Sequence, residues 1–145
     1  MGFENITKDT PCDCLKDALL DTETIFARVL NKDTISDKDF YSKWDKGHTS
    51  ELCEEVCGLK GVSVSKIEND AIKQEIIGLY SQVFKISPKY RRGVLLFKFK
   101  EVAGLLKPTP DEFNKYHHDF YKTDSFNLSL IEQSIIEFLN PASSV

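Results

Sequence analysis

The segment from Gly93 to Lys100, with the sequence GVLLFKFK, is the strongest strand signal in the chain. Alternation places Leu95, Phe97 and Phe99 on one face of this segment, opposite its lysines. Prolines stand on either side, at position 88 and at positions 108 and 110. Because proline ends helices and keeps the preceding residue extended, neither flank continues a helix through the segment. The chain therefore contains a sheet with an apolar face.

Three further segments predict strands or extended structure. Residues 23–30 are rich in β-branched and aromatic side chains, and alternation puts Phe26 and Arg28 on the same face. Residues 61–67 alternate apolar and small polar side chains, and residues 117–121 form an aromatic stretch. Together with the first segment they supply a small mixed or antiparallel sheet.

Helix signals occur in four places. Capping residues followed by apolar side chains at helical spacing predict helices over residues 37–47, 50–58, 70–87 and 128–138. Helices and strands do not alternate strictly, so we expect an α+β fold with about four helices. At 145 residues the chain is long enough for one domain with a real core, with residues 1–10 and 141–145 as frayed ends.

Composition and charge narrow the classes of partner. Nineteen Lys and Arg against 23 Asp and Glu give a net charge of −4, the wrong sign for a domain that binds nucleic acid through phosphates. A local basic cluster at Lys89, Arg91 and Arg92 reads as a solvated turn. No apolar run approaches the length of a membrane span, and the N-terminus does not resemble a signal peptide. We therefore expect a soluble cytoplasmic protein that binds neither nucleic acid nor membranes.

The four cysteines leave three alternatives open. Cys12 and Cys14 form a C-x-C pair, and Cys53 and Cys57 lie one helical turn apart. Four thiolates can bind structural zinc, although this spacing is unlike the common C-x2-C knuckle. Disulfides are disfavoured in a reducing cytosol. We expect free thiols, with Cys53 and Cys57 packed as small apolar side chains.

Two adjacent histidines are candidates for acid–base chemistry. His117 and His118 precede Asp119, and a histidine oriented by a carboxylate is a common general acid or base. On a strand the two imidazoles point to opposite faces, so only one of them can enter a given site.

Arg28 is unusual because it shares a strand face with Phe26. It is either an edge charge that reaches solvent or a clamp for an anion in a cleft. Glycine-rich phosphate-binding motifs, zinc-protease motifs and the G-x-S-x-G motif do not occur.

Short motifs run along nearly the whole chain: Pro11-Cys12-x-Cys14, Phe26-x-Arg28-Val29, Asp39-Phe40-x-Ser42, Gly47, Cys53, Gly61-Val62-Ser63-Val64 and His117-His118. In this order they resemble a family of small uncharacterised bacterial proteins, a resemblance that implies no activity.

The Phe-x-Arg strand followed by a Ser-x-Ser strand more distantly resembles the start of ADP-ribosyltransferase domains. That resemblance implies that Arg28, Ser63 and Ser65 bracket NAD⁺ while a late strand glutamate polarises the ribose. Glu132 and Glu137 fall on the expected C-terminal helix, so only NAD⁺ or nucleotide binding is implied without that carboxylate.

The leading hypothesis is a module that binds a protein or a small molecule without catalysis and without a cofactor. An exposed aromatic cluster from Tyr116 to Tyr121 would mark its recognition surface. The first alternative is an enzyme in which Arg28, Ser63 and one of the two histidines converge on NAD⁺ or a nucleotide. The second is a module stapled by zinc.

Overall fold

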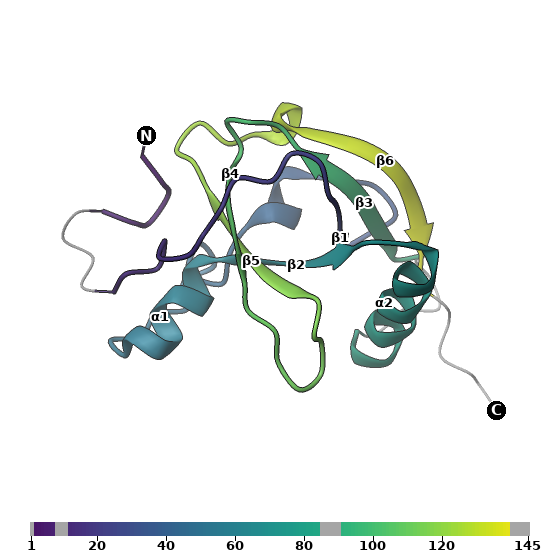
Figure 1. Ribbon diagram of the computed structural model, residues 1–145, viewed down its shortest axis with the longest axis horizontal. Coiled ribbons are helices and arrows are strands. Elements are labelled where there is room, and N and C mark those ends of the chain that lie inside the picture. Colours follow the sequence, from purple (N-terminus) through teal and green to yellow (C-terminus); the bar gives the residue numbers. More distant parts are fainter. Residues whose placement is uncertain (1, 8–11, 85–90, 140–145) are drawn as a thin grey trace.

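The computed structural model describes residues 2–7, 12–84 and 91–139, and its centre is a six-stranded antiparallel sheet with the order β4-β5-β2-β1-β3-β6 (Figure 1). The elements are β1 (Ile25–Val29), α1 (Cys53–Lys60), β2 (Val62–Ile67), α2 (Asp70–Val83), β3 (Gly93–Phe99), β4 (Gly104–Pro108), β5 (His117–Lys122) and β6 (Ile131–Phe138). Two short 3-10 turns span Asp37–Phe40 and Leu128–Leu130. No helix in the described ranges is long and apolar enough to cross a membrane.

The two faces of the sheet are covered differently. One face carries an aromatic core that includes Phe26, Phe40, Phe97, Phe99 and Phe120. The other face packs against α2 near β1 and β3, and against α1 and the N-terminal segment near β5. In Figure 1 the two helices therefore lie apart, with β2 and β5 between them.

The predicted strands are confirmed at β1, β2, β3 and β5, and the alternation in β1 is as expected. Phe26 joins the aromatic core, whereas Ala27 joins the cluster under α2. The helix predicted from residue 70 is also present, and the Asn69 side chain caps it by accepting a hydrogen bond of 2.9 Å from the Ile72 amide. Its predicted end at Pro88 lies outside the described residues.

The expectation of about four helices is wrong, and residues 37–47 give one reason. Only Asp37–Phe40 is helical, as a single 3-10 turn, and Tyr41 is already extended. Burial of Phe40 against the Phe97 ring, with centroids 5.4 Å apart, draws the chain into the aromatic core. Phe40, which was part of the helical spacing of apolar residues, is therefore apolar because it packs in this core.

Residues 128–138 give the other reason, because they form strand β6 and not the predicted helix. Isoleucines at positions 131, 135 and 136 suit a strand as well as a helix. β3 is buried and needs a partner on each edge, and β6 supplies the second one, from the Gly93–Phe138 pair to the Phe99–Ile131 pair. Tertiary pairing overrides the helical pattern here.

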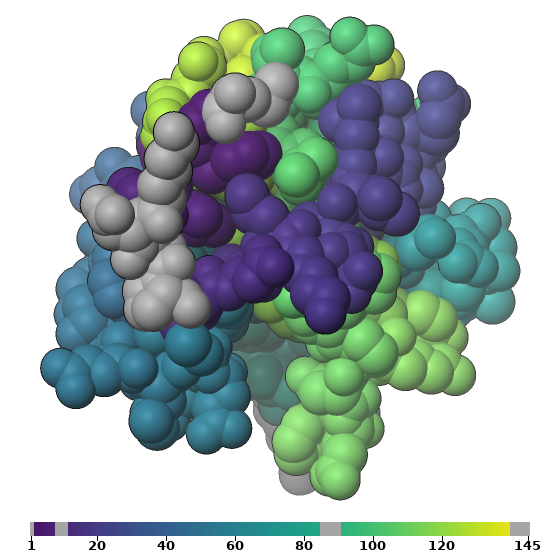
Figure 2. All heavy atoms as spheres, turned by 60° about the vertical axis from the view of Figure 1, so that its left-hand side comes forward, coloured from purple at the N-terminus to yellow at the C-terminus, as the bar shows by residue number. Residues whose placement is uncertain are grey.

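The N-terminal segment is fixed to the body of the protein. Disulfides join Cys12 to Cys53 and Cys14 to Cys57, which corrects the expectation of free thiols. Figure 2 shows this segment, in purple, lying close to α1, in blue. Residues 2–7, expected to fray, also pair with the body, since the Glu4 amide donates to the Lys122 carbonyl at 3.0 Å.

Candidate functional site

A pocket of about 440 Å³ lies where β1 ends and β2 begins. The loop from residue 38 to residue 46 forms one wall, and the C-terminal ends of α1 and α2 form the others. Its described lining contains five of the chain's 19 basic residues but only one of its 23 acidic residues. The basic side chains are those of Arg28, Lys38, Lys43, Lys46 and Arg92. A protein with a net charge of −4 thus concentrates positive charge in one cavity.

Arg28 joins three parts of the chain at this pocket. Its Nε donates to the backbone oxygen of Asp39, and its Nη1 donates to the backbone oxygen of Ser63 at 2.7 Å. The guanidinium carbon also lies 6.0 Å from the centre of the Phe40 ring. Burial lowers the pKa of Arg28, but an arginine stays protonated at physiological pH. The side chain is a fixed cation on the pocket wall.

Arg92 supplies the second guanidinium group. Its Nε donates to the Leu30 carbonyl at 2.7 Å, and its guanidinium carbon lies 5.0 Å from the centre of the Phe84 ring. The contacts come from the residue after β1 and from the C-cap of α2, so they hold Arg92 between a strand and a helix.

The single acidic residue of the lining acts on Arg28 and offsets only part of this positive charge. Asp39 is only 3% exposed, and its carboxylate accepts hydrogen bonds of 2.8 Å from the amides of Asn31 and Ser36. Both carboxylate oxygens are therefore occupied in shaping the loop before the 3-10 turn.

Three lysines complete the lining, and all three are exposed. Within the described ranges, the ammonium groups of Lys38, Lys43 and Lys46 form no ion pair. They are consequently available to an anion that enters from solvent.

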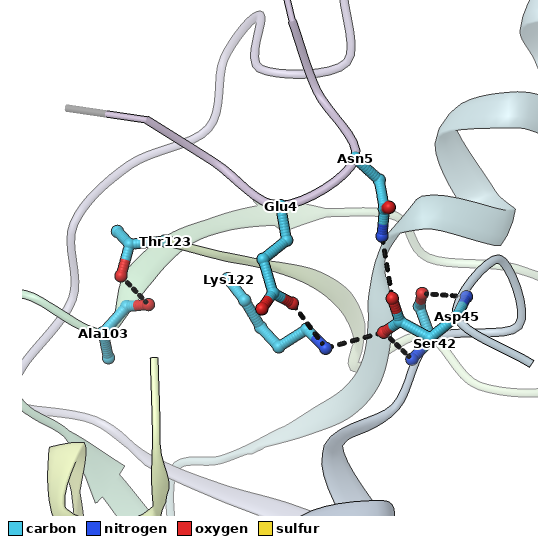
Figure 3. A network of polar contacts seen from close by, with 7 residues as sticks. All are labelled: Glu4, Asn5, Ser42, Asp45, Ala103, Lys122 and Thr123. Atoms are coloured by element: carbon cyan, nitrogen blue, oxygen red, sulfur yellow. Dashed lines mark hydrogen bonds and ion pairs between the residues drawn. The ribbon is translucent and has the colours of Figure 1, made fainter. Parts of the chain in front are cut away.

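The loop that carries Lys43 and Lys46 is anchored by ion pairs of the buried Lys122 side chain (Figure 3). The ammonium of Lys122, a residue only 6% exposed, lies 2.7 Å from the Asp45 carboxylate and 2.9 Å from that of Glu4. Burial alone would raise the pKa of Asp45, but hydrogen bonds from Lys122 and other donors outweigh it and lower the pKa to about 2. The positions of Lys43 and Lys46 thus depend on Lys122, at the end of β5.

Helix ends oppose part of this positive charge. Both α1 and α2 direct their C-terminal ends to the pocket, at Gly58–Gly61 and Val83–Phe84. Each helix terminus carries roughly half a negative elementary charge. Five cations against one carboxylate and two such termini still leave the cavity positive.

The structure brings together two of the predicted ligand-binding residues, Arg28 and Ser63, and both line the pocket. Ser65 is buried elsewhere, where its hydroxyl lies 2.5 Å from the Tyr80 hydroxyl. Tyr121 is also buried, and it donates to the Cys57 carbonyl at 3.0 Å. Because Phe120 and Tyr121 are buried, the expectation of an exposed aromatic cluster from Tyr116 to Tyr121 is wrong.

The two histidines do not belong to the described lining of this pocket. His117 Nδ1 lies 2.8 Å from the Thr109 hydroxyl, and burial lowers the pKa of the imidazole. His118 packs on the other face, with its ring centre 5.5 Å from that of Phe26. The late glutamates lie on β6 and not on the predicted helix, and Glu137 pairs with Lys73 at 3.4 Å.

The cysteines do not form a metal site in this structure. All four sulfur atoms are in disulfides, so zinc binding at these residues would require the reduced protein. Within the described ranges, no three or more His, Cys, Asp or Glu residues lie together so that they could hold a metal ion.

The lysines of the pocket could not be identified as site residues from the sequence. Lys38, Lys43 and Lys46 alternate with aspartates in a segment that predicts a helix. Comparison of the chain with protein-family models, with curated proteins and with solved structures finds no match. The pocket itself is therefore the basis for assigning a function.

Proposed function

We propose that this protein is a binding module whose ligand is a small molecule with more than one negative charge, held in the cationic pocket. One observation carries the proposal: five basic residues and a single, internally bonded carboxylate line a cavity in an otherwise acidic chain. Half-buried, fixed guanidinium groups suit anions that accept two hydrogen bonds at once, such as carboxylates and phosphates.

The pocket also offers apolar contacts. Tyr41, Val83 and Phe84 belong to its lining, so the ligand combines its anionic group with an apolar or aromatic part. Catalysis is not part of the proposal, because the described lining contains neither a histidine nor a carboxylate free of hydrogen bonds.

A nucleotide is a second candidate because Arg28 and Ser63 meet at the pocket, as the resemblance to ADP-ribosyltransferase domains implies. The described lining lacks a late glutamate, so this candidate extends to binding of NAD⁺ or a nucleotide and not to transfer.

The cytoplasmic location inferred from the sequence also stays a prediction. Two disulfides persist more readily in an oxidising compartment, and this favours a site of action outside the reducing cytosol.

The test uses Trp44, the only tryptophan, which lies between Lys43 and Lys46 in the loop. Its fluorescence is titrated with inorganic pyrophosphate, citrate and NAD⁺. We expect saturable binding that weakens with salt, because the rim charges are exposed and screened. Preference for NAD⁺ over pyrophosphate would favour the nucleotide candidate.

A double variant, Lys43→Gln with Lys46→Gln, should weaken binding at least tenfold without shifting the unfolding midpoint. The matched control is Lys16→Gln with Lys100→Gln, which removes two exposed charges outside the pocket lining. An equal loss of binding in both double variants, or no saturable binding by the wild type, would overturn the proposal.

A further inference from the structure

A second cavity, of about 400 Å³, lies between α2 and the segment that connects β4 to β5. Its lining contains residues from both: Glu75, Ile76, Gly78 and Leu79 from α2, and Glu112, Phe113 and Tyr116 from the connection. We infer that this groove binds an organic cation, an alkylammonium or guanidinium group, between its aromatic rings and its carboxylates.

Gly78 opens the groove on the helix side. A Cβ atom built on this residue would meet no atom within 4 Å, so the space beside the helix is empty at this point. Glycine within a helix is less favourable than alanine, and packing against a neighbour does not require it here. The glycine leaves a recess in the surface of α2.

Phe113 forms the lip of the groove and is the most exposed of the large apolar residues described, at 81%. The turn that carries it is nevertheless held in place. Asp111 Oδ1 accepts hydrogen bonds from the amides of Phe113, at 2.8 Å, and Asn114, at 2.7 Å. Asn114 in turn donates to the Ser65 hydroxyl at 2.9 Å, which joins the turn to β2. An exposed ring on a fixed turn can bind a partner at little cost in ordering.

Tyr116 provides a second aromatic ring, and a lysine ammonium already lies over its face. The ammonium of Lys115 lies 5.2 Å from the centre of this ring. The Tyr116 hydroxyl donates to Glu75 at 3.0 Å, so a carboxylate is fixed beside the ring. Aromatic faces attract ammonium and guanidinium groups through their quadrupole.

The carboxylates of the groove favour a positively charged ligand. Glu75 and Glu112 line the groove against one lysine, and Glu112 forms no hydrogen bond or ion pair with any residue that the structure describes. An anion would be repelled, and a neutral apolar ligand would leave Glu112 without a partner. The groove is thus chemically opposite to the cationic pocket, and the two sites can be tested separately.

The experiment compares n-butylguanidinium with n-butylurea, an uncharged analogue of similar shape, by following the ring resonances of Phe113 and Tyr116 in NMR titrations. We expect saturable binding of the cation and at least fivefold weaker binding of the urea. A second arm adds a short arginine-containing peptide, because a free small molecule and an arginine side chain offer the same group. Tighter binding of the peptide would assign the groove to protein recognition, and equal binding would assign it to small cations.

Three variants remove different parts of the site. Phe113→Ala and Glu112→Gln should each weaken binding of the cation several-fold, and Gly78→Leu should abolish it by filling the recess. Val102→Ala and Glu101→Gln are the controls, since both residues are exposed and lie outside the groove lining. The unfolding midpoint of Gly78→Leu is recorded to confirm that the helix remains folded. Absence of saturable binding by the wild type, equal binding of the urea, or binding unchanged in Phe113→Ala and Glu112→Gln would overturn the inference.

Discussion

The Lys122 ammonium lies 2.7 Å from the Asp45 carboxylate, and this contact ties the end of β5 to the loop that carries two lysines of the cationic pocket. Lys122 is the buried member of this pair and Asp45 is exposed, so removing the ammonium loses two charge-assisted contacts but leaves no buried charge unpaired. Lys122→Met should therefore lower the free energy of unfolding by about 1–3 kcal/mol, as measured by urea denaturation. The control is Lys107→Met on the neighbouring strand β4. Lys107 is half-buried and takes part in no ion pair between described residues, so its loss should lower the free energy of unfolding much less.

The same contact makes the free energy of unfolding depend on pH in the acidic range. The pKa of Asp45 is about 2 in the folded protein, against an ordinary value of 3.8. A lowered folded-state pKa stabilises the protein above pH 4, and this contribution is lost as the pH falls towards 2. Asp45→Asn should remove this acid-sensitive part of the stability curve. If wild type and variant lost stability in parallel between pH 4 and pH 2, the ion pair would not be its source.

The ionisation of Asp119 should change the stability with pH in the opposite direction to that of Asp45. It is 5% exposed, and burial raises its pKa to about 7, although a hydrogen bond with Thr109 and the charge of Lys107 oppose the rise. A raised folded-state pKa stabilises the protein at low pH, and the contribution is lost as the pH rises from about 4 through 7. Asp119→Asn should flatten the stability profile in this range and make the protein a few kcal/mol more stable at pH 8. A variant less stable than wild type at pH 8 would contradict this assignment.

Gly104 tests the pairing of β4 with β5. Its φ is +158°, and a Cβ atom there would lie 2.1 Å from the backbone oxygen of Tyr121, on the neighbouring strand. Gly104→Ala should therefore force the strands apart and lower the free energy of unfolding by about 3 kcal/mol or more. Gly58→Ala is the control, because its Cβ would meet nothing within 4 Å and alanine favours a helix. Similar stability of the two variants would contradict the strand pairing.

The disulfides should contribute to stability and not only to the position of the N-terminal segment. They close loops with sequence separations of 41 and 43 residues, and loss of a disulfide from a small domain costs about 2–5 kcal/mol. Thiol titration of the unfolded, unreduced protein should find no free thiol, and reduction should lower the unfolding midpoint by several degrees. Free thiols before reduction would contradict the pairing.

The strands could be predicted from the composition and length of their segments. β1 and β3 are short runs rich in β-branched and aromatic residues, and turn residues or prolines flank them. The segment that forms β6 is different, since Ile131 and Ile135 fit both periods and the pairing with β3 decides between them. A single-sequence pattern does not contain that long-range contact.

The candidate site could be predicted only in part. Arg28 was identified because an arginine on an apolar strand face is unusual, and its link to Ser63 follows from the pairing of neighbouring strands. The contacts of Arg28 also indicate that its removal should destabilise the fold. Arg28 donates to two backbone carbonyls, so Arg28→Ala should cost roughly 2–4 kcal/mol of stability as well as ligand affinity. The rim lysines could not be placed, because their loop was expected to be a helix.

The most direct test of the account is to locate the bound anion. Amide chemical shifts are recorded by NMR while inorganic pyrophosphate is added to the oxidised protein. The account predicts saturable shifts concentrated at residues 28, 38–46 and 92, which line the cationic pocket. Shifts spread over exposed lysines such as Lys16 and Lys100, without saturation, would contradict it.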